Sequence, residues 1–153
     1  MADPVNVHAT AIVVGAAGLL FVGPSGIGKS AMALQCLATA KRAGWNAALV
    51  ADDQVFISRR GDELIATRPA AIADLIEIRG SGIARITSIP EAALHLAVLL
   101  VDPRTAERLP PVDQAYSIPG HGALPQLLLM NDHREPVAAI AALVPHIGIP
   151  TTL

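Results

Sequence analysis

The sequence predicts an α/β fold built around a buried sheet, and three observations support this prediction. First, 52% of the 153 residues are apolar but only 3% are aromatic, so the core must consist of Ala, Val, Leu and Ile. Aliphatic residues of this kind are typical of a parallel sheet that is covered on both faces. Second, short apolar runs alternate with turn residues, as strands do. Third, one apolar run leads into a glycine-rich loop that a helical pattern follows.

The expected elements follow one another along the whole chain. Strands are expected at 11–15, 18–23, 47–50, 55–58, 63–67, 94–101 and 124–130. The first two are expected to form a strand pair joined at Ala16-Ala17, and 55–58 with 63–67 a hairpin around Gly61-Asp62. Helices are expected at 30–42, 70–76 and 137–144. The stretch 103–123 is rich in proline and glycine, and we expect it to form a loop.

Length and charge exclude several classes of protein. A chain of 153 residues fits one domain, and we expect a single domain over 1–153. The net charge is −2 and no basic run alternates with aromatic residues, so no nucleic-acid partner is expected. No apolar run approaches the roughly 20 residues of a membrane-spanning helix. The single cysteine, Cys36, cannot form an internal disulfide, which fits a cytoplasmic location.

Residues 23–30 match the P-loop pattern G-x-x-x-x-G-K-[ST] in full. Glycines let successive N–H groups turn toward an anion, and the N-terminus of the following helix adds partial positive charge. The residues expected to bind nucleotide phosphates are Gly23, Pro24, Ser25, Gly26, Ile27, Gly28, Lys29 and Ser30. Within this loop, Lys29 would reach the β- and γ-phosphates and Ser30 would bind magnesium. The alternative is a glycine-rich turn with an exposed lysine.

A P-loop kinase also needs a carboxylate at the end of an apolar strand. Two places qualify: Asp52-Asp53 after the strand at 47–50, and Asp102 after the strand at 94–101. The pattern alone does not choose between them, and Asp102 precedes a proline, so its alternative role is to open a turn. Because adjacent strand residues point to opposite faces, one of Asp52 and Asp53 is expected to face the site.

The order of these features resembles one known family. His8, the P-loop, the Asp52-Asp53 pair and the segment 76–83, Ile-Glu-Ile-Arg-Gly-Ser-Gly-Ile, together resemble HPr kinase/phosphorylase. The match is to the C-terminal catalytic domain of that family, in the short form familiar from alphaproteobacteria. The last segment resembles the family signature. The resemblance extends over about residues 5–85 and is looser beyond them.

The resemblance implies an α/β P-loop kinase fold similar to phosphoenolpyruvate carboxykinase. It implies that ATP and magnesium serve to phosphorylate a serine of HPr, the carrier protein of the sugar phosphotransferase system. In many members the same site removes that phosphate with inorganic phosphate. The family forms hexamers, so the resemblance also allows a homo-oligomer.

The resemblance further assigns roles to particular residues. The implied catalytic residues are His8, Lys29, Asp52, Asp53 and Arg108, and the implied magnesium ligands are Ser30 and Glu77. One aspartate of the pair would accept the proton of the substrate serine; we favour Asp53, with Asp52 as the alternative. Arg108 rests on a short match, Glu107-Arg108-Leu109, and its alternative is an ordinary surface charge. Glu77 has the alternative of a structural ion pair with Arg79.

Two departures from the family pattern affect what we expect. The chain has no counterpart of the family's N-terminal domain, so only the catalytic domain is expected. The family's C-terminal Pro-Gly-Arg-Asn loop corresponds here to 118–122, Ile-Pro-Gly-His-Gly, which lacks the arginine. Since free phosphate needs nearby positive groups to hold it, we expect the reverse reaction to be weak or absent.

Two other functions fit a P-loop. A small-molecule kinase closes an arginine-bearing lid over the phosphates, but Arg59-Arg60, the only arginine pair here, falls in the expected hairpin. A non-catalytic ATP-binding regulator would be favoured if the acidic residues were missing, and they are present.

Overall fold

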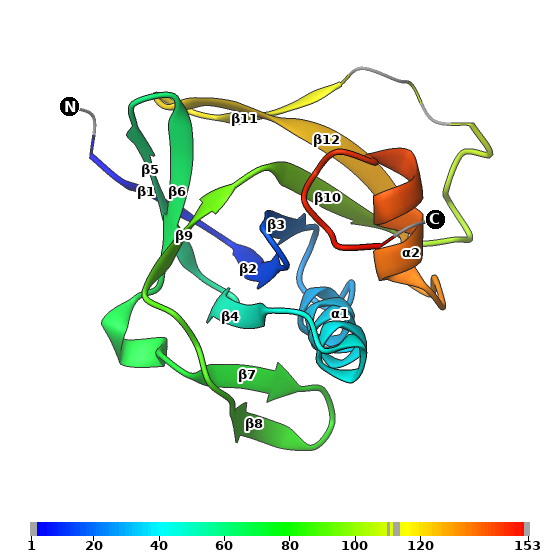
Figure 1. Ribbon diagram of the computed structural model, residues 1–153, viewed down its shortest axis with the longest axis horizontal. Helices are drawn as coiled ribbons and strands as arrows, with labels where there is room; N and C mark the ends of the chain where they lie inside the picture. Colours follow the sequence, from blue (N-terminus) through cyan, green and yellow to red (C-terminus); the bar gives the residue numbers. More distant parts are fainter. Residues whose placement is uncertain (1–2, 110, 112–113, 152–153) are drawn as a thin grey trace.

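The computed structural model describes residues 3–109, 111 and 114–151. These residues form three layers, and the middle layer is a six-stranded sheet (Figure 1). Two helices, α1 (Lys29–Ala43) and α2 (Pro136–Leu143), cover one face of this sheet. A four-stranded antiparallel sheet covers the other face, in the order β1-β5-β6-β9. Its strands are β1 (Val5–Val7), β5 (Val55–Arg60), β6 (Glu63–Thr67) and β9 (Glu91–Leu94).

The central sheet has the order β11-β12-β10-β3-β2-β4. Its strands are β2 (Ala9–Val14), β3 (Ala17–Val22), β4 (Ala47–Ala51), β10 (Leu96–Val101), β11 (Ala115–Ile118) and β12 (Gly122–Met130). β10 is parallel to β3 and β12, whereas β2 is antiparallel to both β3 and β4. The expected pairing of 11–15 with 18–23 is confirmed as an antiparallel hairpin, so the parallel arrangement that the composition indicated does not include β2. Only Gly15 and Ala16 join β2 to β3, and a parallel pair needs a far longer crossover.

The apolar composition is explained by two cores, one on each face of the central sheet. Leu19 and Phe21 of β3 pack in the core under the helices, with Met32 and Cys36 of α1. Leu20 of the same strand packs in the second core, against the four-stranded sheet. Successive strand residues point to opposite faces, so a strand between two cores must be apolar at every position.

A separate hairpin lies beside β4 and α1, at the bottom of Figure 1. It consists of β7 (Leu75–Ile78) and β8 (Gly82–Arg85), which pair with each other. The helix expected at 70–76 is wrong: only a 3₁₀ turn forms, at Ala70–Ile72, and β7 begins at Leu75. Asp74 has a left-handed backbone (φ 66°), which an α-helix cannot continue through.

The other expected elements are confirmed, with ends that shift by a few residues. The stretch 103–123 is less irregular than expected, because β11 lies within it. Its residues 110 and 112–113 lie outside the described part of the chain. Within that described part, no helix is long and apolar enough to cross a membrane.

Candidate active site

The strand directions bring the P-loop and the aspartate pair to one edge of the central sheet. β3 and β4 run in the same direction, since both are antiparallel to β2. The P-loop follows β3 and Asp52-Asp53 follow β4, so both lie at the carboxyl ends of their strands. His8 and Thr10 reach the same edge from the start of β2. Ligands of α/β sheets bind at this edge.

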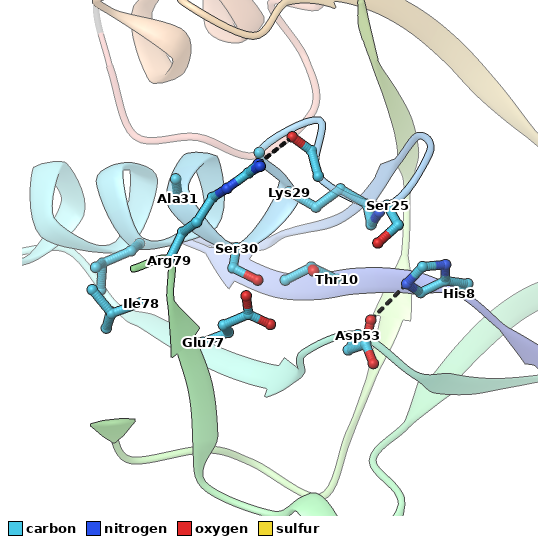
Figure 2. Close-up of a pocket in the computed structure, with 13 residues that line it drawn as sticks. His8, Thr10, Ser25, Lys29, Ser30, Ala31, Asp53, Glu77, Ile78 and Arg79 are labelled. Atoms are coloured by element: carbon cyan, nitrogen blue, oxygen red, sulfur yellow. Dashed lines mark hydrogen bonds and ion pairs between the residues drawn. The ribbon is translucent and has the colours of Figure 1, made fainter. Parts of the chain in front are cut away.

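A pocket of about 440 Å³ lies at this edge (Figure 2). It is lined by His8, Thr10, Ser25, Gly26, Gly28, Lys29, Ser30, Ala31, Leu34, Asp53, Glu77, Ile78 and Arg79. Figure 2 shows His8 and Asp53 at one end and Ala31 and Ile78 at the other, with Ser30 between them. The pocket therefore has a polar end and an apolar end, joined by the P-loop.

The P-loop has the conformation that its glycines were expected to allow. Gly26 and Gly28 have left-handed backbones (φ 84° and 112°), which glycine adopts without strain. Lys29 is only 6% exposed, and its Nζ donates hydrogen bonds to the carbonyl oxygens of Gly23 (2.8 Å) and Pro24 (3.2 Å). The alternative of an exposed lysine in a simple turn is therefore wrong. Burial lowers the pKa of Lys29, and the neighbouring aspartates oppose that shift.

Asp52 is buried next to the pocket and is hydrogen-bonded to three donor groups of the protein. Its carboxylate accepts hydrogen bonds from the Ser30 hydroxyl (2.7 and 2.9 Å) and from the Thr10 hydroxyl (2.8 Å). It also accepts one from the backbone N–H of Glu77 (2.9 Å). Asp52 thus orients Ser30 and fixes Glu77.

Asp53 points into the pocket instead. Its side chain is 63% exposed, and its Oδ1 lies 2.6 Å from Nε2 of His8. Its backbone is left-handed (φ 75°), an unusual conformation for a residue other than glycine. Such conformations cluster at functional sites. As expected for neighbouring residues, the two aspartates face different ways, and the one that we favoured as the base is the accessible one.

The hairpin β7–β8 closes the pocket from the side opposite the P-loop. The Arg79 Nη1 donates a hydrogen bond to the Gly26 carbonyl oxygen (2.6 Å), so this side chain reaches over the P-loop (Figure 2). Glu77 points toward Ser30. Among the described residues no ion pair joins Glu77 to Arg79, so the structural alternative for Glu77 does not form.

Sequence reasoning missed the apolar end of the pocket, formed by Ala31, Leu34 and Ile78, and three polar residues that serve this site. Thr10 and Arg79 line the pocket, and the Asn131 side chain donates to the Ile27 carbonyl oxygen of the P-loop (2.9 Å). Asn131 follows a parallel strand, β12, so its place at a strand end was a usable signal. Thr10 was the one polar residue in an apolar run, which was a weaker signal.

Of the candidates outside the P-loop and the aspartate pair, Arg108 and Asp102 do not line the pocket. Arg108 is exposed in the loop after β10 and does not line the pocket, so its catalytic role stays a prediction. Asp102 accepts hydrogen bonds from the backbone N–H and the guanidinium of Arg104, which hold its pKa at about 2. Its backbone oxygen accepts from Thr105, so Asp102 has the turn-opening role that we gave as its alternative.

The counterpart of the family's phosphate loop is a tight turn between β11 and β12. His121 in this turn is 5% exposed, and its Nε2 lies 2.8 Å from the carbonyl oxygen of Asp3. Arg59 donates to the His121 carbonyl oxygen (2.8 Å). Neither His121 nor Arg59 lines the pocket.

The donor set at the centre of the pocket fits magnesium. Ser30 and Glu77 line the pocket with a hydroxyl and a carboxylate, which are the hard oxygen ligands that this ion prefers. The hydroxyl of Ser30 donates to Asp52, so its lone pairs are left for a cation. No group of three His, Cys, Asp or Glu residues forms a cage within the described ranges. Magnesium needs none, because it usually keeps several waters and binds substrate phosphates.

Comparisons with known proteins agree with this geometry. Residues 1–95 match the family model described as HPr Serine kinase C-terminal domain. Over 108 residues the chain is 34% identical to an HPr kinase/phosphorylase of Mycoplasmopsis pulmonis; this covers 66% of the chain and 33% of that protein. The chain thus spans about a third of the length of this curated relative.

The fold is also similar to a solved structure. The HPr(Ser) kinase/phosphatase from Coxiella burnetii superposes with a TM-score of 0.73 at 26% sequence identity. The similarity covers 92% of this chain and 88% of that one. It therefore includes residues beyond 95, where the family model ends.

Proposed function

Because this chain belongs to the HPr serine kinase C-terminal domain family, we propose that it transfers the γ-phosphate of ATP to a serine of an HPr-type carrier protein. One observation carries the proposal: a P-loop and an accessible carboxylate, Asp53, face each other across one pocket. A phosphate donor and a group that accepts a proton from a hydroxyl are the two parts that such a transfer needs. We also propose that the protein is located in the cytoplasm. That it forms a homo-oligomer stays a prediction.

The pocket suggests how ATP lies in it. The nucleoside would rest on Ala31, Leu34 and Ile78, the apolar end, and the phosphates would follow the P-loop toward Asp53. Lys29 would leave the carbonyl oxygens of the P-loop and bind the β- and γ-phosphates. Magnesium, held by Ser30 and Glu77, would neutralise charge on the phosphate oxygens.

The acceptor serine would approach from the opposite side. A second hollow of about 380 Å³ is lined by Asn6, His8, Asp53 and Gln54, so it shares His8 and Asp53 with the main pocket. A serine hydroxyl there would give its proton to Asp53 while its oxygen bonds to the γ-phosphorus. The bond from that phosphorus to the bridging β-phosphate oxygen breaks, and ADP leaves. His8 would hold the Asp53 carboxylate in place.

The test is phosphate transfer from radiolabelled ATP to purified HPr, compared with a panel of small metabolites. We expect label on HPr, on serine, and on no metabolite. Label on a metabolite alone would favour a small-molecule kinase, and nucleotide binding without transfer would favour a regulator. Arg59 and Arg60 do not supply the lid that the first of these alternatives needs, because Arg59 bonds to His121 and Arg60 pairs with Glu91 (2.9 Å).

Glu77→Gln is expected to weaken nucleotide binding only when magnesium is present. The amide keeps the shape of the side chain but loses the charge that a metal ion needs. We expect the affinity for ATP with magnesium to fall about 10-fold or more, and the affinity in EDTA to stay the same. Calorimetric titration under both conditions measures this. Equal losses in both conditions would mean that Glu77 contacts the nucleotide and not the metal.

The reverse reaction is expected to be weak or absent. Inorganic phosphate gains little from remote binding contacts, so nearby cations must hold it. The family loop that carries an arginine is here the turn with His121, which is buried and hydrogen-bonded away from the pocket. Serine-phosphorylated HPr with magnesium and millimolar phosphate should yield little pyrophosphate. Pyrophosphate at a rate comparable to the forward reaction would show that another group, such as Arg108 or Arg134, replaces that arginine.

A further inference from the structure

The hairpin β7–β8 has no strand neighbour among the described residues, although three of its side chains, Glu77, Ile78 and Arg79, line the pocket. Glu77 of β7 and Arg79, the residue after β7, reach the P-loop region (Figure 2). A two-stranded hairpin by itself is marginally stable in water. Other contacts must therefore hold this hairpin at the angle that directs Glu77 to Ser30.

The two ends of the hairpin are joined by a closed set of hydrogen bonds. Asp74 directly precedes β7 and Ser88 follows β8. Ser88 donates to Oδ1 of Asp74 from its backbone N–H (2.9 Å) and from its hydroxyl (2.5 Å). The backbone N–H of Asp74 donates to the Ser88 hydroxyl oxygen in return (3.1 Å).

Arg68 joins this set from outside the hairpin, just after β6. Its Nη1 donates to the Ser88 hydroxyl oxygen (2.6 Å) and lies 3.6 Å from Oδ1 of Asp74. The Ser88 hydroxyl thus uses its one donor and both acceptor positions. The hydrogen bonds from Ser88 lower the pKa of Asp74, so its carboxylate stays charged opposite Arg68. We call Arg68, Asp74 and Ser88 the clasp.

The clasp is attached to the strand that carries the acidic residues. Ser88 forms a bridge with Leu49 of β4, and the next residue, Ile89, donates to the Leu49 carbonyl oxygen (2.8 Å). Three residues after Leu49 comes Asp52, which accepts the hydrogen bond of the Glu77 backbone. The hairpin is therefore attached at its base to β4, through Leu49, and at Glu77 to Asp52, the residue that follows β4.

The backbone of Asp74 also points to a positional role. Its left-handed conformation (φ 66°) is unfavourable for a residue with a Cβ atom, and such conformations persist where the surroundings hold them. Here the surroundings are the hydrogen bonds of Ser88. The turn at Asp74 changes the chain direction just before β7, so this turn sets the course of the hairpin.

We infer that the clasp of Arg68, Asp74 and Ser88 positions Glu77 at the metal-binding side of the pocket, and so controls metal-dependent nucleotide binding without touching the nucleotide. None of the three lines the pocket, so they are positioning residues. The inference depends on the proposed function in one respect: Glu77 must bind the magnesium ion that accompanies ATP.

Three variants separate hydrogen bonding from backbone strain. Ser88→Ala removes the hydroxyl at the centre of the clasp. Asp74→Gly keeps the left-handed backbone but removes the acceptor, whereas Asp74→Asn tolerates that backbone and keeps an acceptor oxygen. The measured quantity is the ratio of ATP affinity with magnesium to ATP affinity in EDTA. Outer residues that orient metal ligands typically contribute 10–100-fold to metal affinity, so we expect Ser88→Ala and Asp74→Gly to lower the ratio about 10-fold and Asp74→Asn to retain most of it.

Coupling to Glu77 distinguishes positioning from a general loss of stability. In a Glu77→Gln background, Ser88→Ala should lower the ratio little further, because the group that the clasp positions is already lost. A full additional loss would overturn the inference. Glu91→Ala is the matched control: it breaks the exposed Arg60–Glu91 pair on the other sheet and should leave the ratio unchanged.

Hydrogen exchange of the free protein gives a readout without any ligand. The Glu77 amide is bonded to Asp52, so it reports directly on the docking of the hairpin. Ser88→Ala should speed exchange at Glu77 and across 75–85 while α1 and β10 stay unchanged. If wild type binds ATP with no effect of magnesium, the proposed metal role fails and exchange alone decides on the clasp. Unchanged exchange together with an unchanged affinity ratio would overturn the clasp and leave the proposed function intact.

Discussion

Asp53→Asn is expected to lower the rate of phosphate transfer to HPr by about 10²–10⁴-fold, the contribution that a general base makes. Nucleotide affinity should change little, because Asp53 meets His8 (2.6 Å) and belongs to the end of the pocket opposite the apolar side chains. Asparagine has nearly the same shape and accepts the left-handed backbone (φ 75°) of this position. The substitution thus removes the proton acceptor and preserves the local structure.

Asp102→Asn is the matched control for this prediction. Asp102 also follows a central strand, but its carboxylate is bonded to Arg104 and lies outside the pocket. Transfer rates with saturating ATP, together with ATP affinities from calorimetry, should show a loss for Asp53→Asn only. If Asp102→Asn were the damaging change and Asp53→Asn silent, the base would lie on the other strand. If Asp53→Asn abolished ATP binding, Asp53 would act on the nucleotide and not on the acceptor.

The P-loop and its flanking elements were predictable because all the information is local. Eight consecutive residues specify the loop, and Gly44 with Lys41 and Arg42 marks the helix end, where the structure ends α1 at Ala43. The hairpin β5–β6 was similarly marked by Gly61-Asp62 between two short apolar runs. Motifs of this kind are determined by backbone conformations that few residues adopt.

Residue composition alone did not predict strand direction. β2 and β4 are apolar on both faces, and this composition indicated a parallel sheet. An antiparallel strand has the same composition when layers cover both of its faces, as the two cores show here. The direction of β2 follows from the two-residue connection at Gly15-Ala16, which is too short to join parallel strands. This connection can be recognised in the sequence.

The aspartate pair shows how far sequence can define a site. Alternation along a strand predicted that Asp52 and Asp53 face different ways, but it could not tell which one faces the pocket. That depends on partners distant in sequence: Thr10 and the Glu77 backbone hold Asp52 inside, and His8 holds Asp53 at the pocket. Local residue types did not reveal these contacts, which depend on the arrangement of three separate strands.

Lys29→Met is expected to lower phosphate transfer by at least about 10²-fold, the usual cost of losing one group that stabilises charge developing in the transition state. Lys29 is 6% exposed, and its stem lies among the residues of the P-loop, so alanine would also leave a gap. Methionine keeps most of that apolar stem and removes only the charged end.

Because Lys29 is buried, the effect of this variant on the stability of the free protein must also be considered. The Nζ of Lys29 donates to the carbonyl oxygens of Gly23 and Pro24, and Lys29 itself lines the pocket, so we expect water to enter beside the shorter contact that methionine leaves and to bind these oxygens. We therefore expect the thermal unfolding midpoint to stay close to that of wild type. Lys41→Met in the exposed last turn of α1 is the control, and it should retain full transfer activity. Near-normal turnover by a folded Lys29→Met protein would show that the P-loop does not carry the chemistry, and the proposed kinase activity would fall with it.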